Sequence, residues 1–206
     1  HQNKRARDRV VAVGRRIALA AGLNGNSPDF LVLNKQDLQA MFLYPDFVFI
    51  TYGYCKLFQR DDELAAVLGH EIGHHVLLNR RAKRRSSKQH LDKYVTNKFL
   101  KKRRDEYAAD ALSIEFLDKA GYDPKAVLTA LRRSVPRGLR FDEQNDRIDD
   151  TRDPKQVTRY RLNELEAAED STHPLIFDRI NNVKKLLEQR VACRVIPKPP
   201  PPFLGP

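Results

Sequence analysis

The apolar residues of this chain recur at helical spacing in several separate segments. The first segment ends near Gly22, and its apolar positions are Val10, Val13, Ile17 and Ala20. A longer segment begins at the acidic pair Asp61 and Asp62, which suits the first turn of a helix. The apolar positions of that second segment are Leu64, Val67, Leu68, Ile72 and Leu78. Both patterns predict amphipathic helices.

Two short segments have the composition of strands. Residues 29–33 and 47–51 are mostly apolar, and Tyr44-Pro45-Asp46 between them is typical of a turn. Further helices are predicted at 96–119, 124–131, 154–168 and 174–190, with a long polar loop over 136–153. The pattern therefore predicts an α+β fold that is mostly helical and contains a small antiparallel sheet.

The second predicted helix carries the motif His70-Glu71-Ile72-Gly73-His74. Residues four apart lie one turn above each other on a helix, so His70 and His74 can bind the same metal ion. Glu71 is rotated by about 100° from His70, which places its carboxylate where it can act on a bound water molecule. Packed or solvated histidines are the alternative. The spacing predicts a hydrolytic zinc site.

Two histidines and a water molecule leave zinc one ligand short. Glu106 and Asp110 are four residues apart on the helix predicted at 96–119, and the small residues Ala108 and Ala109 would allow the two helices to approach closely. We assign Glu106 as the third ligand. Asp110 is then the acceptor that fixes the tautomer and orientation of a ligand histidine. Solvated helix acids are the alternative for both.

These two motifs resemble those of the gluzincin metallopeptidases. More narrowly, H-E-x-x-H at 70–74 followed by E-x-x-A-D at 106–110 is similar to the family of the CAAX prenyl proteases and the HtpX-like proteases. Further similar stretches lie at 62–68, at 120–124, and at Ser171-Thr172-His173-Pro174 with Arg179-Ile180 beyond. The resemblance covers roughly residues 8 to 190. One departure is Gln39, where the family usually has Asn before its Ala-Phe.

The resemblance implies a soluble, short family member with a single zincin-like domain over 1–193. That domain would be a zinc endopeptidase that acts on protein or peptide substrates in quality control or processing, with one Zn²⁺ per chain. Its implied zinc ligands are His70, His74 and Glu106, with Glu71 as general base. The strand at 47–51 would be an edge strand bordering the cleft, to which an extended peptide can add.

The same resemblance places two further residues beside the metal. His173, in its Thr-His-Pro loop, would either donate a hydrogen bond to the oxyanion or bind zinc as a fourth ligand and keep the enzyme latent. Arg179 would stabilise the oxyanion or hold the substrate backbone. For Arg179 the alternative is an ordinary ion pair with a neighbouring carboxylate.

The net charge of +11 is concentrated in the segment that joins the two predicted metal helices. From Arg80 to Arg104 there are twelve Lys or Arg residues and one acid, Asp92. Such a segment can attract acidic substrates, an anionic membrane surface or nucleic acid. Because no nucleic-acid motif accompanies it, we expect a solvated basic surface first, membrane association next and nucleic acid last.

The remaining features bear on location and alternatives. No apolar run approaches the roughly 20 residues needed to cross a bilayer, and Cys55 and Cys193 either pair or remain free thiols. The chain begins at His1 rather than Met, so we expect a processed or truncated product in an extracytoplasmic compartment, periplasmic or secreted. The Pro-rich segment 194–206 predicts a solvated tail.

Two other function classes stay open at this point. One is a latent or chaperone-like binding module that retains zinc and turns over little substrate, with His173 in the open coordination position. The other is a basic adaptor for a membrane surface or nucleic acid, in which zinc would be incidental.

Overall fold

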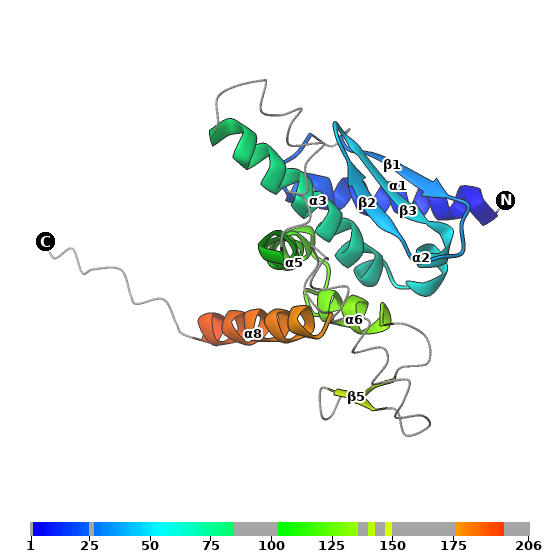
Figure 1. The fold of residues 1–206 in the computed structure, drawn as a ribbon. Coiled ribbons are helices and arrows are strands. Elements are labelled where there is room, and N and C mark those ends of the chain that lie inside the picture. The colour runs from blue at the N-terminus through cyan, green and yellow to red at the C-terminus, as the bar shows by residue number, and fades with distance from the viewer. Residues whose placement is uncertain are drawn as a thin grey trace, which may run out of the picture.

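Helices form most of the described chain, and they stack against one face of a small sheet (Figure 1). The computed structural model describes residues 2–24, 27–84, 103–135, 140–142, 147–149 and 176–195. The helices are α1 (Gln2–Ala20), α2 (Tyr52–Leu57), α3 (Asp61–Arg84), α5 (Arg103–Ala120), α6 (Ala126–Arg133) and α8 (Ile176–Val195). The strands are β1 (Asp29–Leu33), β2 (Ala40–Leu43), β3 (Phe47–Thr51), β4 (Arg140–Asp142) and β5 (Arg147–Asp149). The predicted α+β class, with helices dominant, is confirmed.

The three-stranded sheet is mixed, with the order β1-β3-β2. β1 pairs with β3 in parallel, whereas β2 pairs with β3 antiparallel. The prediction of a purely antiparallel sheet is therefore wrong. The error arises because strand β2 was not predicted. β2 forms a hairpin with β3 through the turn Tyr44-Pro45-Asp46, and this leaves β3 in the centre of the sheet. Residues 47–51 are accordingly not the edge strand beside the metal helix; β2 takes that place and contacts α3.

The connection from β1 to β2 is held against the start of α2. The amide of Gly53 donates to the carbonyl of Lys35 at 2.9 Å. A Cβ atom at Gly53 would overlap the carbonyl oxygens of Gln36 and Asp37, so only glycine allows the backbone at 34–39 to pass this closely. This contact fixes where β2 begins.

The most extensive contact between two elements joins α3 to α5. The helices approach closely because α3 has glycine at the crossing: a Cβ atom at Gly73 would lie 3.1 Å from the Cα atom of Ala109. One turn away, the buried hydroxyl of Ser113 donates to the carbonyl of Ala66 at 2.8 Å. The expected close approach at Ala109 is confirmed, and it brings the side chains of the two helices into reach of each other.

The core lies between the inner face of the sheet and the helices α1, α3 and α5. Helices α6 and α8 cover the other side of the α3–α5 pair (Figure 1). Fully buried apolar side chains come from every layer: Val10, Ile17, Val48, Ile50, Leu64, Leu68, Ile72, Ile114, Leu117 and Val183. The periodic positions read from the sequence in α1 and α3 are largely among the buried residues, which confirms these two helices.

Several other predictions have mixed outcomes. The loop predicted over 136–153 contains the short hairpin of β4 and β5, and α2 had no sequence signal. The predicted helix 154–168 and most of the basic segment 80–104 lie outside the described residues. Of the tail predicted over 194–206, the first two residues belong to α8 and the rest lies outside the described residues. Cys55 is a free, half-buried thiol, and the side chain of Cys193 lies outside the described part. No helix in the described ranges has the length and apolarity that crossing a bilayer requires.

Candidate metal centre

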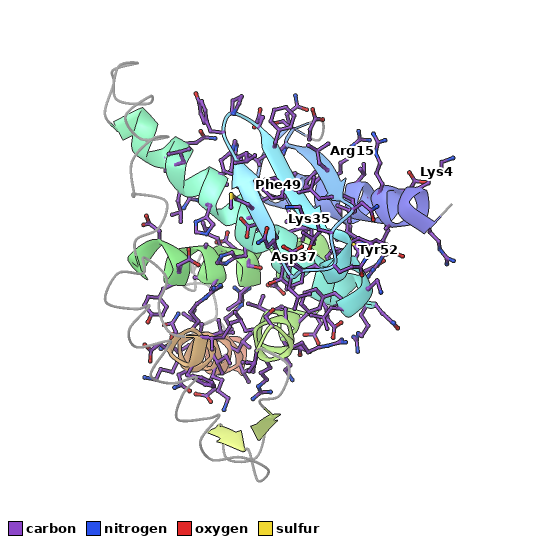
Figure 2. The ribbon with its side chains drawn as sticks, turned by 45° about the vertical axis from the view of Figure 1, so that its right-hand side comes forward. Lys4, Arg15, Lys35, Asp37, Phe49 and Tyr52 are labelled. Carbon is purple, nitrogen blue, oxygen red and sulfur yellow. The ribbon has the colours of Figure 1, made fainter. Side chains whose placement is uncertain are left out.

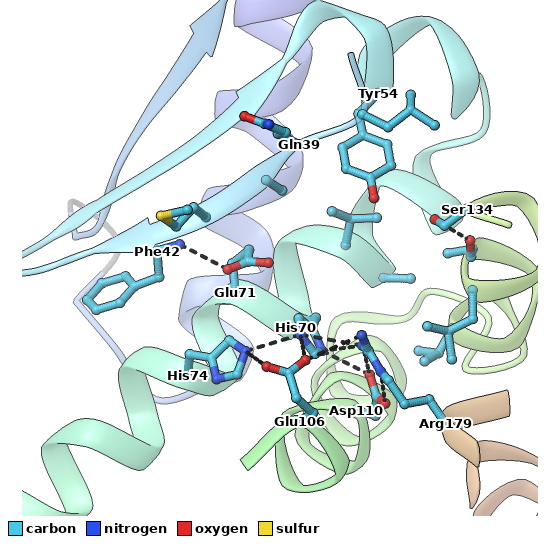
Figure 3. Close-up of a pocket in the computed structure, with 18 of the residues that line it drawn as sticks. Gln39, Phe42, Tyr54, His70, Glu71, His74, Glu106, Asp110, Ser134 and Arg179 are labelled. Carbon is cyan, nitrogen blue, oxygen red and sulfur yellow. Dashed lines mark hydrogen bonds and ion pairs between the residues drawn. The ribbon is translucent and has the colours of Figure 1, made fainter. Parts of the chain in front are cut away.

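Two histidines from α3 and one glutamate from α5 converge at the crossing of these helices (Figure 3). The Nε2 atoms of His70 and His74 are 3.2 Å apart. The carboxylate of Glu106 contacts both histidines, with Oε2 3.3 Å from His70 Nε2 and Oε1 3.3 Å from His74 Nε2. The structure thus brings together the three residues assigned from the sequence as ligands, as a group that could hold a metal ion.

The spacing of these donor atoms fits zinc. Zinc binds imidazole nitrogen and carboxylate oxygen at about 2.0–2.1 Å in tetrahedral geometry, which separates neighbouring donors by about 3.3–3.4 Å. The two Nε2 atoms are 3.2 Å apart, and each lies 3.3 Å from one of the two carboxylate oxygens of Glu106, so each of these three separations is close to that value. Glu106 is almost fully buried, and a buried carboxylate beside two imidazoles is a donor set that suits a divalent cation. The residues present therefore fit the metal that the motif predicts.

Asp110 holds His70 from the side away from the other donors. Asp110 Oδ1 lies 2.9 Å from His70 Nδ1, so a proton on Nδ1 is donated to the carboxylate and the lone pair of Nε2 is left for a metal. Asp110 is buried, with 1% of its surface exposed. This is the contact expected of Asp110 from its spacing to Glu106.

Arg179, from α8, binds the carboxylates behind the donors. Its Nε donates to Asp110 Oδ2 at 2.9 Å and its Nη2 to Asp110 Oδ1 at 2.7 Å. Its Nη1 lies 3.3 Å from Glu106 Oε2. The two-point contact with Asp110 fixes the plane of that carboxylate. Arg179 therefore lies beside the donor group, where it contacts the two acids and also His70, with Nη2 3.2 Å from His70 Nδ1.

The acids and bases of the site shift one another's pKa values. Burial and the charge of Arg179 act to lower the pKa of His70, but the carboxylates of Asp110 and Glu106 outweigh both and raise it to about 9. Burial acts to raise the pKa of Asp110, but Arg179 and His70 outweigh it and hold that pKa below its usual value. Burial likewise opposes the charge of Arg179, and Asp110 and Glu106 raise its pKa overall. A metal binding at Nε2 would have to displace a proton from His70.

Glu71 stands on the opposite side of the donors, beside the edge strand. Its Oε2 accepts a hydrogen bond of 2.9 Å from the backbone amide of Phe42, in the middle of β2 (Figure 3). Glu71 is thus held out of the donor group, as its rotation on the helix predicts. Its carboxylate faces the space between the sheet and the metal donors.

Comparison with known families agrees with this geometry. The model of peptidase family M48 matches residues 4–101 and 86–187, which together span most of the chain. The chain belongs to peptidase family M48. Membership implies metallopeptidase activity on protein or peptide substrates. No significant match to a curated protein was found.

The cleft of this M48 peptidase lies between β2 and the helices. A cavity of about 710 Å³ extends over the donors and Glu71. The sheet side of the cavity is formed by residues 38–44, and its far end by the apolar side chains Val67, Val127, Leu131 and Ile176. Tyr54 and Ser134 add hydroxyl groups there, and burial raises the pKa of Tyr54 so that its phenol stays neutral. The cavity is therefore mostly apolar away from the metal donors.

Two further histidines, His75 and His173, are not among the donors described above. His75 is buried and packs its ring edge-on against Phe42, with Nε2 2.8 Å from Asn79 Nδ2, so it is a packing residue and not a member of the donor group. His173 lies outside the described residues, and both roles considered for it stay predictions. Sequence reasoning missed the amide of Phe42 and the contact made by Gly73. The glycine inside the motif was a usable signal for close helix packing; a backbone amide leaves no signal in a sequence.

Proposed function

We propose that this M48 peptidase is a zinc-dependent endopeptidase of the gluzincin type, with His70, His74 and Glu106 as the zinc ligands. The observation that carries the proposal is the convergence of the three side chains: the two Nε2 atoms are 3.2 Å apart, each lies 3.3 Å from an oxygen of Glu106, and Asp110 contacts His70 from behind. The flanking motifs support placing it in the branch of the CAAX prenyl proteases and HtpX-like proteases.

A zinc ion bound there would supply a Lewis acid that activates a water molecule and polarises the scissile carbonyl. Glu71 would take the proton from the attacking water and deliver it to the leaving amine. The hydrogen bond from Phe42 holds the carboxylate on the cleft side of the donors, where a substrate on β2 would lie. Asp110 would keep Nδ1 of His70 protonated, so that the lone pair of Nε2 always faces the metal.

We assign to Arg179 mainly the role of positioning the two acids of the site, Asp110 and Glu106. Its guanidinium contacts both Asp110 and Glu106, and it offsets the charge of two carboxylates that are each only 1% exposed. Without that cation, two buried carboxylates this close would favour protonation, and a protonated Glu106 is a poor ligand. A contact between Arg179 and the oxyanion stays a prediction.

The test is a digest of casein and of a peptide library by the purified protein as isolated, after chelation, and after restoring zinc. The proposal expects cleavage that chelation abolishes and zinc restores, at one zinc per chain. Stoichiometric zinc with no cleavage under any condition would favour the latent binding module. Cleavage that persists without metal would exclude the proposed chemistry.

A further inference from the structure

The sheet turns an apolar face away from the helices. Side chains alternate along each strand, and the strand register brings those of one set together. The members of this set, here called the outer sheet face, are Leu31, Leu33, Met41, Leu43, Phe47 and Phe49. Several are substantially exposed: 43% for Leu31, 48% for Met41, 44% for Leu43 and 38% for Phe47. Phe49 can be seen near Lys35 and Asp37 in Figure 2.

The outer sheet face reaches the cleft through β2. Within the described residues, β2 pairs with β3 on one side and with no strand on the other. The backbone of Phe42 points away from β3, because its amide donates to Glu71. In an antiparallel pair the backbone groups alternate in direction, so those of Ala40 point the same way. Since the amide of Phe42 is engaged by Glu71, an extended polypeptide could add to β2 along the cleft through the outward backbone groups of Ala40 and the carbonyl of Phe42.

A strand added to β2 would have two sets of side chains. Residues opposite Ala40 and Phe42 would face the helices and the metal donors, because Phe42 is a buried, inner-face residue. Residues opposite Met41 and Leu43 would extend the outer sheet face. Met41 and Leu43 also line the cavity that contains the donors, so the two surfaces are continuous. The added strand would meet apolar side chains from β2 at every second position.

We propose that the outer sheet face next to β2 is part of the substrate site and selects extended polypeptide segments with apolar side chains at alternate positions. This inference rests on the proposed peptidase function and names its substrate class: strand-forming apolar segments, which folded proteins bury and unfolded ones expose. Covering Met41 and Leu43 removes apolar surface from water, and that favours such segments over polar ones.

The charges at the border of this face agree with a polypeptide occupant. Asp29 and Asp37 are exposed there together with Lys35. An anionic bilayer surface attracts clusters of Lys and Arg, and each acid at the border would oppose that contact. A polypeptide with mixed polar residues between its apolar ones meets no such penalty. The mixed border therefore favours a peptide segment over a lipid surface.

The experiment uses the full, zinc-loaded chain and three fluorogenic peptides of one composition. Two of the peptides have valine at every second position. In one the valines occupy the odd-numbered positions counted from the scissile bond, and in the other the even-numbered positions. The third has the same residues with the valines moved into adjacent pairs. Two variants are compared with the wild type: Leu43→Ser on β2, and Leu31→Ser on β1. Leu31 is as exposed as Leu43, but β3 separates it from the cleft edge, which makes it a matched control.

The wild type should cleave one alternating peptide with kcat/KM about tenfold above that of the paired-valine peptide, the effect of a few apolar contacts. Leu43→Ser should reduce this ratio at least threefold, while Leu31→Ser keeps both rates. Equal cleavage of all three peptides by the wild type overturns the substrate class but leaves the peptidase function standing. An equal loss in Leu31→Ser overturns the assignment too, because a surface for a bilayer or a second copy would use the whole face.

Fluorescence anisotropy can measure the binding of the same peptides to Glu71→Gln protein. This measurement tests the substrate class independently of peptide-bond cleavage. Tighter binding of the alternating peptide supports the substrate class even where turnover is slow. If the wild type cleaves none of the peptides and the Glu71→Gln protein binds them equally, both the peptidase function and the substrate class are contradicted.

Discussion

The two walls of the cleft are built in opposite ways. On the helical wall, α3, α5 and α8 enclose charged side chains: Glu106 and Asp110 are each 1% exposed and contact a histidine and Arg179. On the sheet wall, β2 presents apolar side chains such as Met41 that are about half exposed, and an edge that pairs with no further strand among the described residues. The buried wall sets the positions of individual atoms, whereas the open wall can accommodate many sequences. We therefore expect large losses of activity from changes in the first and graded changes in preference from the second.

The largest effect is expected from the ligand positions themselves. His70→Ala and Glu106→Gln each remove one donor of three, so zinc affinity should fall by well over the roughly 100-fold upper cost of losing an outer partner. Glu115→Gln is the matched control, since Glu115 is an exposed acid on the same helix that pairs with Lys119. Zinc affinity would be measured by competition with a chromogenic chelator. Full affinity in Glu106→Gln would remove Glu106 from the ligand set.

A smaller loss of zinc affinity or activity is expected from a change at Asp110, which contacts the ligand His70 but is not itself a ligand. Asp110→Asn should lower zinc affinity or kcat/KM about 10- to 100-fold without unfolding the protein, because His70 loses the acceptor that fixes its tautomer. Asp118→Asn is a close control: Asp118 pairs with Arg190, so it also joins α5 to α8 through an Asp–Arg contact, but away from the donors. Similar losses in the two variants would mean that helix attachment, and not the tautomer of His70, accounts for the effect.

A change at the crossing of α3 and α5 should lower the free energy of unfolding. Gly73→Val would place a branched side chain against the backbone of Ala109, where even a Cβ atom comes within 3.1 Å. We expect the free energy of unfolding to fall by about 1–3 kcal/mol, the usual cost of overpacking. Zinc affinity should fall too, because α5 must move and carry Glu106 with it. Ala108→Val, at a half-buried position of α5, should cost only about half a kcal/mol in helix propensity. Urea denaturation of the metal-free and zinc-bound forms would measure both the stability and the zinc affinity of these variants. Unchanged zinc affinity in Gly73→Val would show that the helix crossing does not set the positions of the metal donors.

The contrast between the walls also explains what the sequence could predict. The donors of the helical wall were found because helical spacing is local: His70 and His74 are one turn apart, as are Glu106 and Asp110. The sheet wall was misread because β2 is only four residues long and the parallel pairing of β1 with β3 is not encoded locally. The assignment of the cleft edge to 47–51 failed for the same reason. The contacts of Arg179 with Asp110 and Glu106 depend on how α8 packs against α5, which no local pattern states.

The most direct test of the central claim measures zinc content and kcat/KM on the same samples of wild-type and Glu71→Gln protein. The account separates the groups that hold the metal from the group that moves the proton, and Glu71 belongs only to the second. It predicts one zinc per chain in both proteins and a loss of kcat/KM of about 100- to 10,000-fold in Glu71→Gln, the usual contribution of a general base. Retained activity in Glu71→Gln, or loss of its zinc, would contradict the account.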